Sequence, residues 1–303
     1  MIAVAVVTGP TASGKTGLAI ELARRLGGEI VSADSQQLYR GLDVGTAKPT
    51  AEERAAAPHH LLDAADPGEG MDAARYLLLA DRAIAGIAER GRLPIACGGT
   101  GLYLRVLLHG VAEAPPRDPG LRAALEGEAA RQGRPALHAR LAAVDPEAAA
   151  RIGPNDLVRI VRALEIARGG RTQSRLFAEH GFRGDRYRHR ILALDLPREE
   201  LHRRIEERVE RMFAGGMLDE AAALLSRFGE VLPPRLPIGY AEAAQVVAGK
   251  VSRAEAVRRV QVAHRRYARR QVIWLRREPG VEWVRPPFDA GALALRLADL
   301  RPR

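Results

Sequence analysis

One segment of the sequence has residue types and spacing suited to binding phosphate. GPTASGKT, at residues 9–16, fits G-x-x-x-x-G-K-[ST] and directly follows an apolar run from Ile2 to Val7. In such a loop the backbone N–H groups surround phosphate oxygens, the lysine reaches the outer phosphate, and the last hydroxyl binds Mg²⁺. The expected phosphate-binding residues are Gly9, Pro10, Thr11, Ala12, Ser13, Gly14, Lys15 and Thr16, with Thr16 as the metal ligand. The alternative is a glycine-rich turn without a ligand.

Two further polar segments follow expected strands. DSQQLY, at residues 34–39, comes after an apolar run at 29–33, and GGTG, at 98–101, comes after another at 93–97. Because the carboxyl ends of parallel strands share one edge of a sheet, Asp34 is expected near the reacting end of the ligand. The alternatives for Asp34 are that it caps a helix or that it binds a water molecule of a magnesium ion. The Gln37 amide could bind an adenine edge.

The elements needed to position these loops alternate along the chain. Expected strands lie at 2–8, 29–33, 93–97 and 191–196, and expected helices lie at 14–26, 72–90 and 101–109. This order predicts an α/β protein with a doubly wound parallel sheet of the phosphate-loop type. Residues 113–186 look wholly helical, which predicts an insertion domain within a core of residues 1–112 and 187–303. The C-terminal part is expected to be helical at about 198–213, 217–228, 240–248 and 252–276.

Length and composition narrow the class of protein. A chain of 303 residues can bury a large core, and no run approaches the ~18 apolar residues of a membrane span. The apolar N-terminus lacks the basic flank and cleavage site of a signal peptide. The single cysteine, Cys97, excludes a disulfide framework and a thiolate metal cluster, and its expected strand indicates a core residue, although a reactive role is the alternative. These features predict a cytoplasmic protein. His59 and His60 are interpreted as structural or substrate-adjacent.

The basic residues concentrate in one expected helix. The net charge is +10, and residues 250–277 contain ten basic residues and one acidic residue, Glu255. On a helical wheel, the arginines 258, 265, 269 and 276 form one line, whereas Val260, Ala263, Tyr267 and Trp274 take the other side. We therefore expect one face to dock on the core and the other to bind a polyanion. A solvated charged helix is the alternative.

Several motifs occur in order between residue 1 and about residue 277. They are GPTASGKT at 9–16, DSQQLY at 34–39, DVGTAKP at 43–49, GGTGLY at 98–103, RALE at 162–165 and IGY at 238–240. Together they resemble the bacterial tRNA dimethylallyltransferases, also called tRNA isopentenyltransferases. The resemblance implies transfer of a dimethylallyl group from dimethylallyl diphosphate to N6 of the adenosine 3′ to the anticodon, with Mg²⁺ as cofactor. It also implies that the loop holds the donor diphosphate, although such loops are often labelled ATP sites.

The resemblance further implies roles for individual residues. Asp34 matches the family base, Thr100 matches the threonine of its GGT motif, and Arg208 matches an arginine of its R-I-x-x-R helix. A basic residue commonly follows the tyrosine of IGY in the family, and Ala241 departs from that pattern. The residues expected to contact the tRNA anticodon stem-loop are Asp34, Ser35, Gln36, Gln37, Gly101, Ala123, Val158, Arg159, Ile160, Val161, Arg162, Leu236, Pro237, Ile238, Gly239, Tyr240 and Ala241.

Three other functions use some of the same residues. A nucleotide or nucleoside kinase would use the phosphate loop, with Asp34 as the base for a hydroxyl, but it has no need of the basic helix. A prenyltransferase acting on free AMP or ADP would not require the helical insertion. A non-enzymatic RNA-binding protein would leave the loop and Asp34 without purpose. A single large basic surface favours a monomer.

Overall fold

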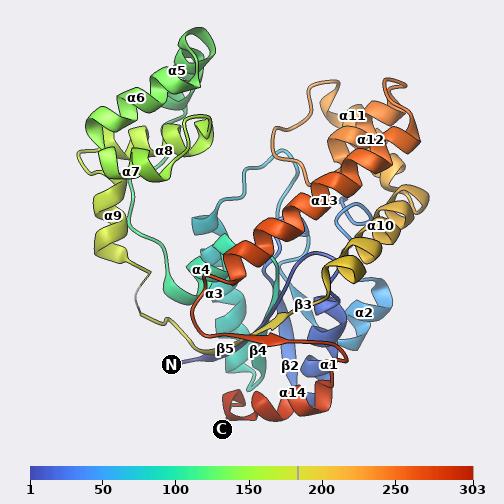
Figure 1. The fold of residues 1–303 in the computed structure, drawn as a ribbon. Coiled ribbons are helices and arrows are strands. Elements are labelled where there is room, and N and C mark those ends of the chain that lie inside the picture. Colours follow the sequence, from blue (N-terminus) through green and yellow to red (C-terminus); the bar gives the residue numbers. More distant parts are fainter. Residues whose placement is uncertain (183, 303) are drawn as a thin grey trace. The chain divides into compact units, whose positions relative to one another are not determined.

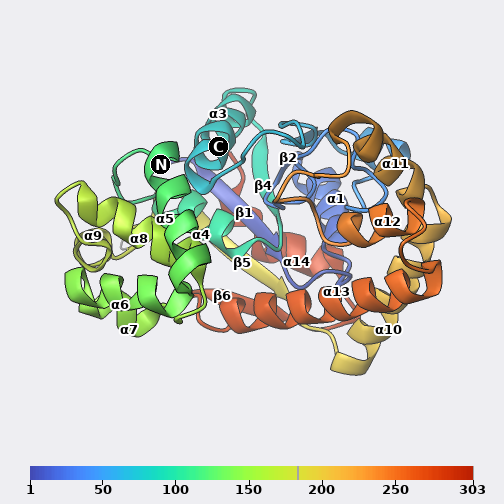
Figure 2. The same ribbon diagram turned by 90° about the horizontal axis from the view of Figure 1, so that it is seen from above.

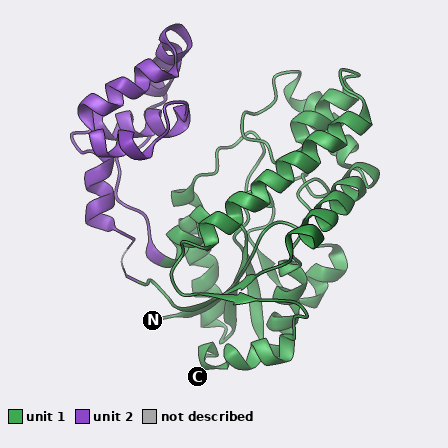
Figure 3. Cartoon of the chain, in the orientation of Figure 1, with its two compact units in different colours: residues 1–108, 185–303 green, residues 109–184 purple. Residues whose placement is uncertain are grey.

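The computed structural model describes residues 1–182 and 184–302. The chain divides into two compact units, which Figure 3 colours separately. Unit 1 comprises Met1–Leu108 and Asp185–Arg303, and unit 2 comprises His109–Gly184. Unit 2 therefore begins and ends a little earlier than the insertion expected at residues 113–186. Within the described residues, the helices are all too short or too polar to cross a membrane.

Unit 1 is built on a six-stranded parallel sheet in the order β3-β2-β4-β1-β5-β6. The central strand β1 is apolar throughout its middle, and the four residues from Val4 to Val7 have no exposed surface. Such continuous burial is typical of a parallel strand covered on both faces. The predicted α/β class is confirmed. The strands are β1 Ala3–Thr8, β2 Gly28–Ser32, β3 His59–His60, β4 Leu93–Gly98, β5 Arg188–Leu194 and β6 Val281–Val284.

Helices cover both faces of the sheet. The connections from β1 to β2 and from β3 to β4 run in opposite directions along the sheet, so right-handed crossovers place α1 and α3 on opposite faces. Figure 2 shows α1 and α14 on one side of the strands and α3 and α4 on the other. Leu18, Leu22 and Leu26, spaced four residues apart, are buried on one face of α1. These helices are α1 Lys15–Leu26, α3 Ala73–Glu89, α4 Gly101–His109 and α14 Ala290–Arg296.

Four helices lie between β5 and β6, and the last of these four is the expected basic helix. They are α10 Arg198–Ala214, α11 Met217–Phe228, α12 Tyr240–Val247 and α13 Arg253–Leu275, which runs diagonally in Figure 1 from α12 toward α4. Ser252 caps the N-terminus of α13, because its hydroxyl accepts a hydrogen bond from the Glu255 N–H at 3.2 Å. The elements that the sequence patterns do not predict are the short helix α2 Ala51–Ala56, β3, β6, α14 and the 3₁₀ turn Ala298–Leu300.

Unit 2 is helical and has its own core. Its helices are α5 Pro119–Gln132, α6 Arg134–Val144, α7 Pro146–Arg151, α8 Leu157–Arg168 and α9 Gln173–His180. Leu137, Leu141 and Ile160 are completely buried in it. The carboxylate of Glu165 is also buried, where it accepts hydrogen bonds from Arg122 at 2.6 Å and from the Asp118 N–H at 3.1 Å. The RALE motif at 162–165 thus holds α5 against α8.

Candidate active site

Three loops meet at the carboxyl edge of the sheet. They follow β2, β4 and β1, which are adjacent strands, so their residues converge although they lie far apart in sequence. The Thr100 N–H donates to the Ala33 carbonyl at 3.3 Å. A side chain at Gly98 would lie 2.2 Å from that same carbonyl group, which explains a glycine there. The structure therefore brings the phosphate loop, Asp34 and Thr100 to one edge.

The phosphate loop has the geometry that its motif predicts. Gly9 and Gly14 have φ values of 149° and 90°, which favour glycine, and α1 begins at Lys15. The Lys15 Nζ makes one long hydrogen bond, 3.5 Å to the Pro10 carbonyl. The hydroxyl of Ser13 is buried and has no hydrogen-bond partner among the described residues. The loop therefore offers donors that a bound phosphate would satisfy.

Thr11 differs from its expected role in the loop. Its backbone N–H donates to the side-chain oxygen of Gln271 at 2.8 Å, so this N–H is engaged within the protein and does not face a phosphate. The nitrogen of the same Gln271 amide donates to the Gly99 carbonyl at 2.8 Å. Gln271 thereby fixes the phosphate loop from α13, a contact that none of the sequence motifs predicts.

A strongly basic pocket of about 370 Å³ opens beside this loop. Arg204, Arg208 and Arg211 line it from α10, together with Lys15 and Glu53. Arg204 pairs with Glu200 at 2.6 Å, whereas the Nε of Arg208 is buried and has no partner in the described part of the chain. Four cations and one carboxylate thus line a pocket of a size that suits a small anion such as a diphosphate.

Burial makes the cations of this pocket costly without a ligand. Desolvation lowers the pKa of Lys15 and that of Arg208, and the Asp34 carboxylate opposes both shifts. Two buried positive charges therefore share one nearby negative charge. Because buried charges without partners are strongly unfavourable, the site favours binding a further anion. His264 is neutral beside Arg208, since burial lowers its pKa to about 4.

The residues of the pocket suit a magnesium ion held mainly by its substrate. Thr16 lines the pocket at the first turn of α1. In the part of the chain that the structure describes, no group of three or more His, Cys, Asp or Glu side chains could hold a metal. Mg²⁺ commonly takes one or two protein oxygens, with phosphates and waters completing its shell. The single hydroxyl of Thr16 fits that coordination.

A second pocket, of about 300 Å³, has a different character. Tyr39, Tyr103 and Tyr267 line it, as do residues of the 34–37 and 236–241 stretches. The Ile238 N–H donates to the Gln36 side-chain oxygen at 3.0 Å, which ties these two stretches together. Burial raises the pKa of Tyr267 to about 12, and its phenol hydrogen-bonds with the Thr100 and Gln36 side chains. The pocket therefore combines aromatic rings and neutral polar groups with two arginines, Arg235 and Arg270.

Asp34 links the two pockets, and Thr100 is hydrogen-bonded to the residue that follows Asp34. One oxygen of the Asp34 carboxylate accepts a hydrogen bond from the Gln36 N–H at 2.9 Å. The Thr100 hydroxyl accepts from the Ser35 N–H at 2.9 Å and lies 3.1 Å from the Ser35 hydroxyl. The Asp34 carboxylate thus acts on the cations of the first pocket, while the next two residues line the second.

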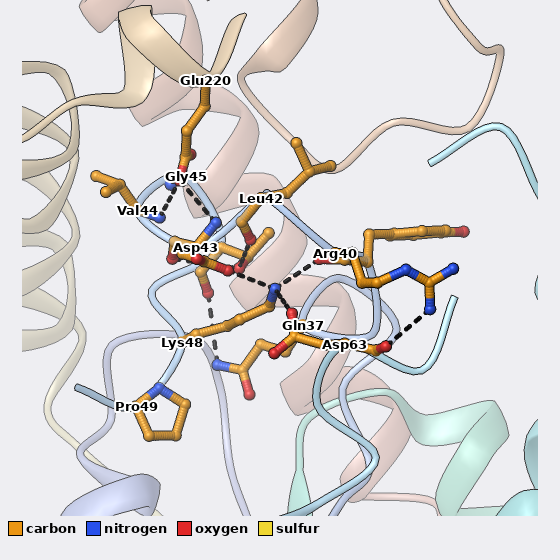
Figure 4. A network of polar contacts seen from close by, with 12 residues as sticks. Gln37, Arg40, Leu42, Asp43, Val44, Gly45, Lys48, Pro49, Asp63 and Glu220 are labelled. Atoms are coloured by element: carbon orange, nitrogen blue, oxygen red, sulfur yellow. Dashed lines mark hydrogen bonds and ion pairs between the residues drawn. The ribbon is translucent and has the colours of Figure 1, made fainter. Parts of the chain in front are cut away.

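The DVGTAKP segment at 43–49 forms a buried polar network beside the site, drawn in Figure 4. Lys48 Nζ contacts the carboxylates of Asp43 and Asp63 at 2.5 and 2.6 Å, with its side chain 1% exposed. The Glu220 carboxylate accepts from the N–H groups of residues 43, 44 and 45 at 2.7 to 3.1 Å. Arg208 donates to the Thr46 carbonyl at 3.3 Å. This segment therefore helps to place an arginine of the basic pocket.

Some expected tRNA contacts have structural roles. Tyr240 is fully buried and donates to Glu220 at 2.6 Å, and the side chains of Ile160 and Val161 are buried in unit 2. The Gln37 amide donates to the Ala47 carbonyl at 2.9 Å, so it is not free to bind an adenine edge. These four residues pack or hydrogen-bond within the chain, and their contact with RNA stays a prediction. The exposed members of the set are Ala123, Val158, Arg159 and Ala241, and partly exposed ones are Asp34, Ser35, Gln36, Gly101, Arg162, Leu236 and Ile238.

The basic face of α13 is partly paired. Arg258 and Arg259 pair with Glu255, and Arg265 pairs with Glu206 of α10 at 2.7 Å. The other arginines form no ion pair with a carboxylate among residues 1–182 and 184–302, and their side chains are exposed: Arg266, Arg269, Arg270, Arg276 and Arg277. The buried face consists of Ala256, Val257, Val260, His264, Ala268, Gln271 and Leu275. Tyr267 and Trp274, both expected on that face, are partly exposed.

His59, His60 and Cys97 make contacts within the fold of unit 1. His60 contacts the buried Glu29 carboxylate at 2.7 Å, and His59 contacts the Ala57 carbonyl at 2.8 Å. Cys97 is buried in β4, and burial raises the pKa of its thiol to about 12. The interpretation of Cys97 as a core residue is confirmed.

Comparison with known proteins identifies the family. A family model described as IPP transferase matches residues 37–278. A tRNA dimethylallyltransferase of Anaeromyxobacter sp. (strain K) is 74% identical over 297 residues, which cover 98% of this chain and 97% of that protein. The structure of a full-length tRNA isopentenylpyrophosphate transferase from Bacillus halodurans is similar, with a TM-score of 0.70, 39% identity and coverage of 98% and 94%.

A second similar structure comes from a eukaryotic dimethylallyltransferase acting on tRNA. Its TM-score is 0.81 at 26% identity, and the match covers 98% of this chain and 78% of that one. The matches extend over nearly the whole of this chain and include both units. The chain therefore belongs to the IPP transferase family.

Proposed function

We propose that this protein transfers a dimethylallyl group from dimethylallyl diphosphate to N6 of the adenosine 3′-adjacent to the anticodon in tRNA. The names of its relatives support prenyl transfer to tRNA. The observation that carries this proposal is that the Asp34 carboxylate acts on the cations of one pocket, while Ser35 and Gln36, the next two residues, line the aromatic pocket. A diphosphate donor and a purine acceptor need these two environments.

The donor side of the reaction is electrostatic. As the bond to the allylic carbon breaks, negative charge develops on the departing diphosphate, and Lys15 and Arg208 are placed to stabilise it. The loop N–H groups hold the same oxygens. A Mg²⁺ ion held by Thr16 would supply further positive charge for the leaving group. Thr100 adds a hydroxyl at the junction of the pockets.

The acceptor side requires a base. The amino group of adenine is a poor nucleophile because its lone pair is delocalised into the ring. A carboxylate that takes its proton as the C–N bond forms accelerates such a step by roughly 10²–10⁴-fold. Asp34 is that proton acceptor. Tyr103 and Tyr267 offer ring faces on which the target adenine, flipped out of its stack, can rest.

RNA binding is assigned to the exposed basic residues. Arg266, Arg269 and Arg277 present unpaired charge on α13 and just after it, and Arg159 presents charge on α8. Phosphate contacts of this kind fix an RNA without reading its sequence. We assign the protein to the cytoplasm as a monomer that binds one anticodon stem-loop.

One assay tests the proposal. Radiolabelled dimethylallyl diphosphate, Mg²⁺ and an unmodified anticodon stem-loop should give labelled RNA, and a stem-loop with guanosine at the target position should stay unlabelled. Labelling of free AMP in preference to the stem-loop would identify a nucleotide prenyltransferase instead. Release of ADP from ATP in the presence of an acceptor, without RNA labelling, would identify a kinase.

A further inference from the structure

The buried side of α13 carries one amide that joins two loops of the site. Gln271 is 5% exposed. Its oxygen accepts from the Thr11 N–H at 2.8 Å, and its nitrogen donates to the Gly99 carbonyl at 2.8 Å. Thr11 belongs to the donor loop after β1, and Gly99 precedes Thr100 in the loop after β4. A single side chain therefore sets the spacing between the phosphate loop after β1, here called the donor loop, and the loop after β4 that carries Thr100.

The surroundings of this amide leave it little freedom. A side chain at Gly99 would begin 2.1 Å from the Gln271 nitrogen, so only glycine admits the amide at this distance. One turn further along α13, the ring of Trp274 lies 2.2 Å from the place of a side chain at Gly101. Arg105 packs over that ring at 5.1 Å. The inner face of α13 thus packs closely against the GGTG loop at Gly99 and at Gly101.

The outer face of the same turns is exposed and basic. Arg266 and Arg269 lie within five residues of Gln271 and form no ion pair with a carboxylate in the described chain. A polyanion that binds these arginines restrains the helix that holds Gln271. Restraint of the helix is transmitted to the donor loop by the two hydrogen bonds, because both loops are fixed to one rigid amide.

We propose that Gln271 is a positioning residue that couples RNA binding on α13 to the geometry of the donor loop. This inference rests on the function proposed above. Coupling between two sites is reciprocal, so the RNA should tighten diphosphate binding and diphosphate should tighten RNA binding by the same factor. Loss of the amide should remove the coupling and misplace the donor while leaving the arginines in place.

The test compares the wild type with Gln271→Met, which keeps the length of the side chain and removes both hydrogen bonds. The dissociation constant of Mg²⁺-inorganic diphosphate is measured by calorimetry with and without the stem-loop. In the wild type the RNA should tighten binding about fivefold or more, and in the variant the factor should fall close to one. The variant should also lose about tenfold or more in kcat, with the KM for RNA within a few-fold. Gln261→Met, the same change elsewhere on α13, is the matched control.

A second variant approaches the amide from the other side. Gly99→Ala places a methyl group against the Gln271 nitrogen, and 2.9 Å from the Gly9 carbonyl, without altering α13, so it should reproduce the loss of coupling even where Gln271→Met folds poorly. Retained coupling in both variants, with normal transfer by the wild type, would overturn the inference. Absence of transfer by the wild type would overturn the proposed function instead.

Discussion

The two pockets of the site recognise ligands by different means. The pocket beside α1 is lined by Lys15, Arg208 and two further arginines and by no aromatic ring of the described chain, whereas the pocket beside Gln36 is lined by three tyrosine rings, by Leu236 to Ile238 and by Arg235 and Arg270. Charge recognises a diphosphate, and flat apolar faces recognise a purine. The difference indicates that donor and acceptor selection are separate properties of the chain. Changes in one pocket should therefore leave the affinity of the other pocket's ligand largely intact when that ligand is measured alone.

The largest effect is expected at Asp34, whose carboxylate acts on the cations of the first pocket and is followed by two residues that line the second. Asp34→Asn keeps an oxygen that can accept the Gln36 N–H but removes the base, so single-turnover transfer should slow by about 10²-fold or more. Diphosphate binding should stay equal or become tighter, because the variant removes the negative charge beside Lys15 and Arg208. Transfer at the wild-type rate would remove Asp34 from its assigned role.

Lys15→Met should affect the donor pocket alone. Loss of a charged hydrogen-bond donor should weaken diphosphate binding by about ten- to a hundredfold, with RNA binding unchanged. Competition of unlabelled diphosphate against a labelled donor measures the first effect, and filter binding of the stem-loop measures the second. Equal loss of both affinities would contradict the separation of the pockets.

The same substitution predicts a pH dependence of stability. Burial lowers the pKa of Lys15 below 10.5, so the ligand-free fold disfavours the charged amine that the unfolded chain carries. In the wild type this penalty is present at pH 7 and shrinks as pH rises toward 10.5. Urea unfolding at pH 7 and pH 9.5 should therefore show Lys15→Met gaining on the wild type at the lower pH. A stability difference that is constant with pH would contradict this reasoning.

Replacement of Arg266, Arg269 and Arg277 by Gln tests the RNA-binding face. For each arginine–phosphate interaction that the variant removes, the log–log salt slope of RNA binding should fall by about 0.7–0.9, and transfer at saturating RNA should change little. The control replaces Arg258 and Arg259, which already pair with Glu255. An unchanged slope in the triple variant would mean that this face is only a solvated surface and that unit 2 holds the RNA.

The smallest effect is expected at Tyr240, whose hydroxyl donates to Glu220. Tyr240→Phe should lower the free energy of unfolding by about 1–3 kcal/mol, because a partly buried carboxylate loses one donor. The KM for RNA should not change, since the side chain of Tyr240 is fully buried. Thermal unfolding and steady-state kinetics measure the two quantities, and a raised KM with unchanged stability would restore Tyr240 as an RNA contact.

The sequence was sufficient for the parts of the site built from local motifs. The phosphate loop follows a buried strand and starts a helix, so its type and place could be predicted, and the edge shared by parallel strands placed Asp34 with it, whereas Thr100 was assigned through the family resemblance. Gln271 could not be found in this way, because its partner Thr11 is 260 positions away. The IGY motif assigns Tyr240 to the RNA, whereas the burial of this residue depends on contact with Gly45 in another segment.

Elements without a strong local pattern could not be predicted either. The edge strand β3 has two residues, too few for any periodicity, and it pairs with β2 over that length only. The boundaries of the longer helices were predicted to within a few residues, since apolar spacing and the Ser252 cap mark them.

The placement of the lysines makes the chain a convenient subject for chemical labelling. The sequence has three lysines. Lys15 lies in the basic pocket and Lys48 in the network of Figure 4, both buried, whereas the side chain of Lys250 is 57% exposed. A bulky amine-reactive dye should therefore attach at Lys250 and at the exposed N-terminus. A fluorophore at Lys250, just before α13, would report on movement of that helix without any engineered cysteine.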